Sequence, residues 1–570
     1  MTRVPRGSFT TAKKCLNMTQ NVVQRGETSS SSNNTEWEAP RPLEPPVEKA
    51  AMDVRWRDLP NQGQLFILAL CRLSEPLSNV CLLPYIFYLV RSVLPASDDD
   101  NSTDDSAARV SEYSGLLVAA FPLAQCVISL PWGRLSDKHG RRFSIIGGLL
   151  VSVIANIGFG LSRSFGALLF WRMLAGLANG NVSIMRTVTA EVVRERKYQT
   201  KAFLLLPLVF NSGMVLSLAL GGCLAEPVVN LPALFGPDGI FNWSGYPEGV
   251  QWTLEYPYAL PALLNAFLLG TSLLLAVLGL KETLLGKEEH SDWGLQIGTV
   301  VRRLAMHLLN RGRTSHKYTM MHYNEEANFL NDGGPSPEKT EPSIALAKPA
   351  KVPFRGIWSR KVVSALVSFG LLPLHNSAFM HIFPVYLSSP PADNSEATLF
   401  AFSGGLGLRS ATIGLWLSAF GIGGILLQLF IYPRLQKRIG TRGVFRIALF
   451  LFPVTYVAAP YLSLLAGDHG TRWVFLGFVV CAQIMARTMA IPSTVILLTE
   501  AAPAKTVLGT VHGAGNMLAS LARAVGPAVG GYVFALGVEE GVIGLVWWLY
   551  LVGVALCALA WSYFTEDGTV

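Results

Sequence analysis

The stretch "GRLSDKHGRR", residues 133–142, lies between two long apolar runs. Its ten residues include five basic side chains when His139 is counted, one carboxylate, Asp137, and two glycines, Gly133 and Gly140. Glycine adopts backbone conformations that tight turns require. The stretch therefore predicts a short charged loop between two membrane-crossing helices, with a glycine turn at each end.

The composition is typical of a membrane protein. Of the 570 residues, 51% are hydrophobic and 15% are charged, whereas about a quarter of the residues of a soluble protein are charged. The apolar residues come in blocks of about 20, the length that crosses a bilayer, and most blocks lack a polar face. We predict an all-α membrane protein with twelve transmembrane helices, in the blocks 64–90, 111–132, 143–162, 166–189, 200–225, 255–280, 358–387, 410–432, 443–465, 472–497, 507–536 and 541–564.

The polar segments divide the chain into two sets of six blocks. We predict a disordered tail, an N-terminal six-helix bundle, a linker, a C-terminal six-helix bundle and a short tail, over 1–60, 61–280, 281–357, 358–565 and 566–570. Within the linker, the apolar residues of 293–309 recur at helical spacing, which favours an amphipathic helix on the inner leaflet. A loosely ordered linker segment is the alternative.

The short loops differ in charge between the two sides of the membrane. Lys and Arg gather in 134–142, 194–201 and 434–442, and the opposite loops are nearly free of them. Basic loops stay on the cytosolic side, so we expect both termini and the linker to be cytosolic. The far side carries two glycosylation sequons, at Asn101 and Asn242. No sorting signal decides between the plasma membrane and the vacuolar membrane.

The charged stretch recurs in the second half of the chain. "PRLQKRIGTR", residues 433–442, aligns with 133–142, and Arg434 follows Arg134 by 300 residues. Gly221 and Gly222 likewise correspond to Gly530 and Gly531. Duplicated halves with a binding site between them are the general plan of secondary transporters.

The stretch 133–142 matches, at every fixed position, the signature that lies between the second and third spans of the major facilitator superfamily. The chain resembles that superfamily over about residues 60–565, and "CRLSEPLSNVCLLPY", residues 71–85, resembles the fungal twelve-span drug:proton antiporters. The resemblance implies two pseudo-symmetric six-helix bundles, transport by alternating access, and a monomer. Ser217 and Leu218 stand where the antiporter signature of span five has Gly and Pro, so the direction of transport stays open.

The resemblance also implies a conformational latch, formed by Gly133, Asp137, Gly140, Arg141 and Arg142. In the superfamily it closes the cytosolic side in the outward-open state. Asp137 is suited to pair with a neighbouring Arg and with the positive N-terminal end of a helix from the other half. The alternative is that Asp137 only caps the next helix.

Three ionisable residues within the spans are candidates for proton coupling, since buried charges in membranes are costly and usually functional. Arg72 and Glu75 are three residues apart and share a helix face; they form either a structural ion pair or, through Glu75, a proton carrier. Arg172, in "WRMLAGLANG", resembles the span-four arginine that the family links to proton-coupled transport. We expect it to face inward, toward Glu75 or toward backbone carbonyls.

Spans one, seven and ten provide candidate cavity residues. They are Tyr88, His375, Phe379 and Arg487, and an aromatic wall suits a bulky amphiphilic organic substrate. The rings fit a lipid-facing position equally well, and a lone histidine such as His375 or His381 is more often a packing residue.

The motifs exclude several function classes. The chain has no GxxxxGK[ST] for ATP and no HExxH, GxSxG or DFG arrangement, and its histidines lack metal-ligand spacing. We predict no enzyme activity, no cofactor and no metal; the expected partners are a small-molecule substrate, protons and the lipid bilayer, with no nucleic acid. The predicted function is proton-coupled export of a drug, toxin or secondary metabolite. The alternatives are an importer or uniporter of a nutrient or metabolite, and a non-transporting membrane sensor on the same fold.

Overall fold

The computed structural model describes residues 58–95, 103–193, 195–243, 245–284, 293–310, 354–392, 398–465, 467, 469–503 and 507–564. They belong to one compact unit, Arg55–Val570. Helices dominate these ranges, whose only extended pairing is a single bridge between Pro391 and Gly404. The predicted tails, 1–60 and 566–570, and most of the linker lie outside the described residues.

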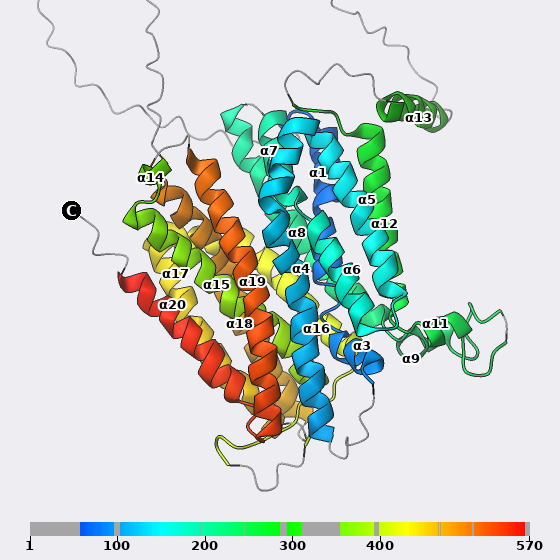
Figure 1. Ribbon diagram of the computed structural model, residues 1–570, viewed down its shortest axis with the longest axis vertical. Helices are drawn as coiled ribbons and strands as arrows, with labels where there is room; N and C mark the ends of the chain where they lie inside the picture. Colours follow the sequence, from blue (N-terminus) through cyan, green and yellow to red (C-terminus); the bar gives the residue numbers. More distant parts are fainter. Residues whose placement is uncertain are drawn as a thin grey trace, which may run out of the picture. The chain divides into compact units, whose positions relative to one another are not determined.

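The first bundle precedes the linker. Its long helices are α4 (Thr103–His139), α5 (Arg141–Gly160), α6 (Phe165–Ala178), α7 (Asn181–Val192), α8 (Arg196–Leu224) and α12 (Ala259–Gly279). Its first span is broken into α1 (Gln62–Arg72), α2 (Ser74–Asn79) and α3 (Ile86–Val93). Between α8 and α12 lie the short helices α9 (Pro227–Asn230), α10 (Pro232–Phe235) and α11 (Gln251–Glu255). Figure 1 shows α9 and α11 to one side of the bundle.

The second bundle follows the linker. It consists of α14 (Phe354–Ile357), α15 (Arg360–Ser388), α16 (Ser410–Leu426), a π-helical turn (Leu427–Ile431), α17 (Tyr432–Ala458), a 3-10 helix (Ala459–Leu465), α18 (His469–Ala501), α19 (Leu508–Glu539), a second π-helical turn (Val546–Leu551) and α20 (Val552–Phe564). Large aromatic side chains fill its interior, where Phe379 packs on Phe383, Tyr456 and Trp547.

The predicted duplication is visible in the backbone. Gly140 separates α4 from α5 at φ 113°, and Gly440 interrupts α17 at φ 73°. Both angles lie in a region that favours glycine over residues with a Cβ. The two copies of the charged stretch therefore contain the same backbone break 300 residues apart, which confirms the pseudo-symmetric fold.

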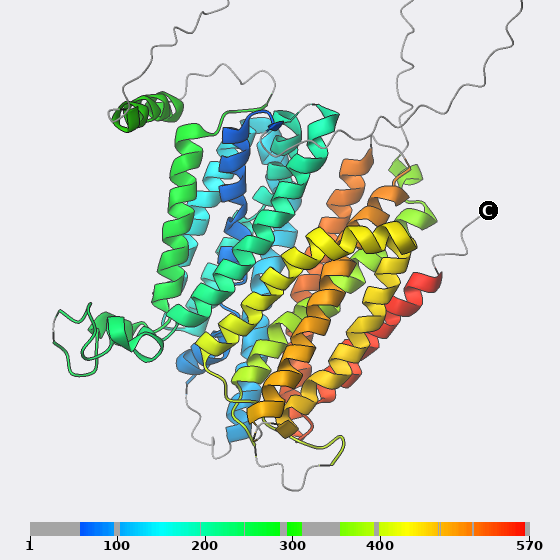
Figure 2. The same ribbon diagram turned by 180° about the vertical axis from the view of Figure 1, so that it is seen from behind.

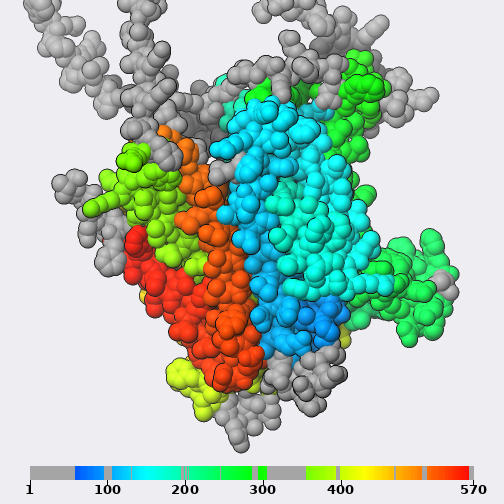
Figure 3. All heavy atoms as spheres, viewed as in Figure 1, coloured from blue at the N-terminus to red at the C-terminus, as the bar shows by residue number. Residues whose placement is uncertain are grey.

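The largest contacts between the bundles are those of α4 with α19 and of α8 with α16 (Figure 2). Gly115 of α4 contacts Gly531 of α19, and Gly222 of α8 contacts Gly414 of α16. A Cβ on Gly115 would lie 2.6 Å from the Pro527 carbonyl oxygen, so these glycines allow the helices to approach closely. The two contacts are equivalent under the duplication, because Gly222 of α8 corresponds to Gly531 of α19. Figure 3 shows the atoms of α4 and α19 touching on one face of the protein.

These glycine contacts lie at one end of the bundles, and the charged stretch lies at the other. We call the end where α4 meets α5 the basic end, after residues 134–142, and the end with the glycine contacts the opposite end. In α4, Gly115 lies against Gly531, whereas Cys126, closer to the basic end, lies against Met517. The two helices are therefore antiparallel, and their closest approach is remote from the basic end.

The described residues include nine helical stretches that are long and apolar enough to cross a membrane. One of them, Ser410–Leu465, covers two of the predicted blocks, while the blocks 64–90 and 166–189 are broken into shorter helices. The membrane character is confirmed, and the count of twelve spans stays a prediction.

The linker segment 293–309 forms helix α13 (Trp293–Asn310), which lies across the end of α12 in Figure 1. Gly294 and Gly298 contact the backbone at Val277 and Leu278 of α12. Trp293 is 82% exposed. The segment is helical in the structure, and its amphipathic position on the inner leaflet stays a prediction.

We expect a Gly222→Leu substitution to loosen the opposite end. The new side chain would collide with the Ser410 carbonyl and with Gly414. Overpacking costs about 1–3 kcal/mol, which lowers the population of the closed form relative to the open form by about fivefold to 150-fold. A cysteine in place of Ser111, buried at the other contact, should then react faster with a water-soluble maleimide.

Gly270→Leu is the matched control, because a Cβ on Gly270 would meet no atom within 4 Å. An unchanged labelling rate in Gly222→Leu would show that the glycine contacts do not close this end.

Candidate functional site

A cavity of about 400 Å³ lies between the two bundles, within the range of about 300–1,000 Å³ that is usual for ligand sites. Its apolar wall includes Val118, Phe210, Leu372 and Met380, contributed by both bundles. The charged side chains that line it are Arg72, Glu75, Arg186, Arg487 and Arg523. The cavity lies between the basic end and the glycine contacts, which separate it from the opposite end.

The break in the first span exposes backbone carbonyls that need partners, since no water is available in a bilayer interior. Arg172 supplies one: its Nη1 donates to the Ser78 carbonyl oxygen (2.5 Å) and its Nη2 to Asn79 Oδ1 (3.0 Å). Asn265 Nδ2 donates to the Leu77 carbonyl (3.0 Å). Arg172 is buried and faces inward, but it contacts these groups and not Glu75.

Glu75 is the centre of an ion-pair network that links the bundles. Its Oε2 accepts from Arg72 Nη1 at 2.6 Å, and its Oε1 accepts from Arg523 Nη1, on α19, at 3.1 Å. Arg523 Nη2 also donates to Gln125 Oε1 (3.3 Å). The expected pair of Arg72 and Glu75 is present, and Glu75 is 4% exposed. The contact with Arg523 could not be foreseen, because the two residues are 448 positions apart.

Of the four predicted cavity residues, the structure places only Arg487 in the wall. His375 and Phe379 are fully buried in the aromatic interior of the second bundle, where His375 Nδ1 lies 2.8 Å from the Tyr456 hydroxyl. Successive residues of a helix point about 100° apart, so another face of α15 reaches the cavity, with Met380 and His381.

The fourth candidate, Tyr88, lies on α3 and connects the bundles. Its hydroxyl donates to the Leu408 carbonyl oxygen at 2.6 Å, immediately before α16. Among the described wall residues Tyr88 is absent. It therefore contributes to the contact between the bundles and not to the wall.

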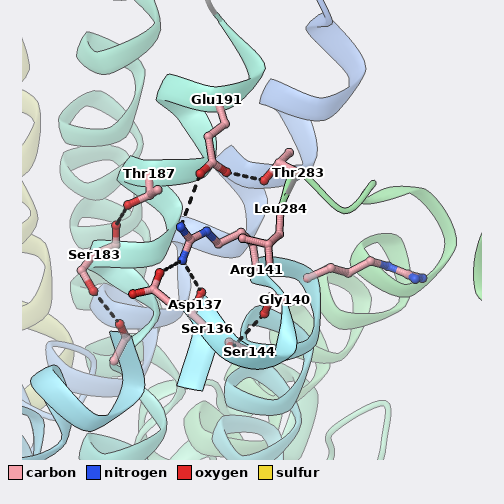
Figure 4. Close-up of polar contacts among 12 residues, drawn as sticks. Ser136, Asp137, Gly140, Arg141, Ser144, Ser183, Thr187, Glu191, Thr283 and Leu284 are labelled. Carbon is pink, nitrogen blue, oxygen red and sulfur yellow. Dashed lines mark hydrogen bonds and ion pairs between the residues drawn. The ribbon is translucent and has the colours of Figure 1, made fainter. Parts of the chain in front are cut away.

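At the basic end, Arg141 lies between two carboxylates. Its Nη1 pairs with Asp137, one turn earlier in the chain, and its Nη2 lies 3.4 Å from Glu191 Oε1 on α7 (Figure 4). Thr283 donates to the other oxygen of Glu191 at 2.5 Å. Asp137 pairs within its own half, and its side chain is 67% exposed.

A third carboxylate caps the helix that follows the charged stretch. Glu282 accepts hydrogen bonds from the backbone N–H groups of Arg141 (2.9 Å) and Arg142 (3.1 Å), at the N-terminus of α5. Helix N-termini favour negative charge. The capping role considered for Asp137 is thus taken by Glu282. Arg142 reaches the end of α12, donating to the Val277 carbonyl at 2.7 Å.

The expected glycine turn at Gly133 is wrong. Gly133 lies inside α4, which continues to His139, and only Gly140 forms a turn. No turn forms at Gly133 because the helix does not end with the apolar run: residues 134–139 extend it beyond that run. A Cβ on Gly140 would collide with the Glu282 carboxylate, so this glycine also makes room for the helix cap.

Of the two predicted glycosylation sites, only Asn242 is among the described residues. Asn101 lies outside the described residues. Asn242 lies in the segment between α10 and α11, where its Nδ2 donates to the Pro237 and Tyr246 carbonyls at 2.7 and 2.9 Å. Glycosylation at either stays a prediction.

Sequence analysis missed three partners: Arg523 for Glu75, and Glu191 and Glu282 for the residues around Gly140. Arg523 is a charged residue within a predicted span, 507–536, which is itself a signal of a functional role, but no spacing rule pairs it with the first span. Glu191 and Glu282 lie at predicted helix ends, where acidic residues are common.

Comparisons with known proteins agree with this architecture. A family model described as Major Facilitator Superfamily matches residues 78–393. The chain is 32% identical over 507 residues to the Major facilitator superfamily multidrug transporter mfsB of Aspergillus fumigatus, with 85% of this chain and 80% of that protein covered. It is 23% identical to the efflux pump azaK of Aspergillus niger, with 87% and 86% covered.

Solved structures show the same fold. The xylose transporter XylE from E. coli, in a partially occluded inward open conformation, aligns with a TM-score of 0.56 at 10% identity, covering 88% of this chain and 97% of that chain. At this identity the likeness concerns the fold alone.

Proposed function

The chain belongs to the Major Facilitator Superfamily, and from this premise we propose that it exports small organic compounds across a membrane in exchange for protons. The substrates would be drugs, toxins or secondary metabolites. The multidrug transporter of Aspergillus fumigatus, 32% identical over 85% of this chain, and the efflux pump of Aspergillus niger support the direction and the substrate range.

The observation that carries the proposal is the cavity between the bundles, which the contacts at Gly115 and Gly222 separate from the opposite end. Alternating access requires two bundles that move about a shared site. In this conformation the cavity lies on the side of the basic end. If that end is cytosolic, as the distribution of Lys and Arg predicts, the protein is ready to take up substrate from the cytosol.

Glu75 is the proposed proton carrier. Its carboxylate lies in the wall of the cavity and pairs with an arginine of each bundle. Protonation would remove its negative charge and weaken both pairs, one of which, with Arg523, joins the bundles. The proton would thereby favour the separation that opens the opposite end. Arg172 would support this step indirectly, by fixing the broken span that carries Glu75.

The latch would control the other end of the cycle. Asp137 is exposed and paired only with Arg141 among the described residues, so it is available to a helix end of the second bundle when the basic ends approach. We place the protein in the plasma or vacuolar membrane as a monomer, with both termini in the cytosol.

Reconstitution of the purified full chain into liposomes tests the proposal. A gradient of one pH unit stores about 1.4 kcal/mol per proton, which is enough for about tenfold accumulation of a labelled compound. We expect such accumulation for at least one member of a panel of antifungal drugs and fungal metabolites, and its loss after addition of a protonophore.

Other results would favour the alternatives. Flux that equilibrates the compound and ignores the protonophore would indicate a uniporter. Accumulation in the inward direction would indicate an importer. The absence of flux for the whole panel, with a correctly folded protein, would favour the sensor.

A further inference from the structure

The charged residues of the cavity wall are strongly unbalanced. Four arginines, Arg72, Arg186, Arg487 and Arg523, face a single carboxylate, Glu75, among the described wall residues. Both oxygens of Glu75 are already engaged, one by Arg72 and one by Arg523. The wall therefore has an excess of positive charge that Glu75 does not neutralise.

Arg487 is the clearest case of a cation without an anionic partner. It lies on α18, and its Nη1 and Nη2 each point to the thioether sulfur of Met214, on α8, at 3.4 Å. A thioether is a weak acceptor. In the described part of the chain, no carboxylate pairs with Arg487. Its guanidinium, with five donors in a planar fork, is suited to bind a carboxylate, sulfonate or phosphate with two hydrogen bonds.

The surroundings of Arg487 favour an apolar body attached to that anionic group. Met214, Phe210 and Leu372 are part of the same wall. A cationic compound, by contrast, would be repelled by the uncompensated arginines, and Glu75, the single carboxylate among the described wall residues, is already paired.

We propose, building on the proposed transport function, that the cavity binds small organic anions with an apolar body, and that Arg487 holds their charged group. Arg487 extends from the second bundle to Met214 of the first, so an anion bound there contacts both bundles. Substrate binding and the relative position of the bundles are thereby linked.

Binding to the purified full chain in detergent tests this independently of transport. The probes are matched aromatic acids and amines of one to three rings, such as 1-naphthylacetate and 1-naphthylethylammonium, measured by equilibrium dialysis. Because the Arg487 guanidinium donates charge-assisted hydrogen bonds to a carboxylate and repels an ammonium, we expect the acids to bind about tenfold or more tightly than the matched amines.

The variants Arg487→Gln and Arg487→Lys locate the site. We expect Arg487→Gln to lose about tenfold or more of its affinity for the acids, with Arg487→Lys in between. Its affinity for the amines should stay the same or rise, because one repelling charge is removed. Arg434→Gln is the matched control. Arg434 is exposed, outside the cavity wall, and bonded to the Phe430 carbonyl of the preceding turn. It should bind the acids as the wild type does.

Several outcomes would overturn the proposal: amines bound as tightly as acids, no acid of the panel bound, or acid affinity unchanged in Arg487→Gln. If that variant fails to fold, the wild-type preference and Arg487→Lys still decide. Arginine-dependent binding of acids without flux in liposomes would refute the transport function alone, and proton-coupled flux of the amines would refute only the anionic substrate class.

Discussion

A Glu75→Gln variant will reach its membrane but lose the dependence of transport on the pH gradient. Glutamine has nearly the same shape as glutamate, yet it neither binds a proton in this pH range nor balances the charges of Arg72 and Arg523, at 2.6 and 3.1 Å. Removing one partner of a buried ion pair costs about 3–5 kcal/mol. Because no carboxylate is left to carry the proton, we expect the about tenfold accumulation in liposomes to fall to simple equilibration of the compound.

The matched control is Glu255→Gln, the same substitution at a surface ion pair. Glu255 pairs with Arg163, and both side chains are more than half exposed. Such a pair contributes about 0–1 kcal/mol, so transport and its pH dependence should stay as in the wild type. If Glu75→Gln keeps its dependence on the pH gradient, Glu75 is a structural residue and the proton uses another path.

A double variant separates stability from coupling. Glu75→Gln combined with Arg523→Gln removes one positive charge together with the negative one. We expect its thermal stability in detergent to recover relative to Glu75→Gln alone, because a charge left without its partner is the costly state. Proton coupling should not recover, since no carboxylate is restored.

An Asp137→Ala variant is expected to abolish transport while the protein still reaches its membrane. The Asp137 side chain is 67% exposed and pairs with Arg141 alone among the described residues. Its loss should cost the free energy of unfolding no more than about 1 kcal/mol. The same loss removes the carboxylate that would hold the basic ends of the two bundles together in the outward-open state.

Lys437 provides the control, because it occupies in the second copy the position that Asp137 occupies in the first. Lys437→Ala should transport at a rate close to that of the wild type. Membrane localisation by fluorescence and flux in liposomes are measured on both variants. Wild-type rates in Asp137→Ala would refute the latch.

The helices were largely predictable, and their interruptions were not. Apolar blocks placed the helices that are long and apolar enough to cross a membrane, because lipid requires a continuous apolar surface. The first span was predicted as one block, 64–90, yet it breaks after Arg72 and again between Asn79 and Ile86. Such breaks depend on outside partners, here Arg172 and Asn265, which satisfy the freed carbonyls.

The site was predicted only where its partners are close in sequence. Arg72 and Glu75 share a helix face at a spacing of three residues, and Asp137 and Arg141 at a spacing of four, so local geometry brings each pair together. The direction in which a side chain faces within the bundle was harder to predict. His375 and Phe379 point into the second bundle, although they belong to the same helix as Met380 and His381 of the cavity wall.

The sequence by itself determined that this chain is a duplicated helical membrane protein of a known superfamily. Three features of the chain do not depend on how its helices pack against one another. They are the length of the apolar runs, the 300-residue repeat and the stretch 133–142. Only the tertiary structure decided which charges are compensated. Arg523 pairs with Glu75, whereas among the described residues Arg487 contacts a thioether and no carboxylate, because contacts across bundles depend on the approach of helices that are hundreds of residues apart.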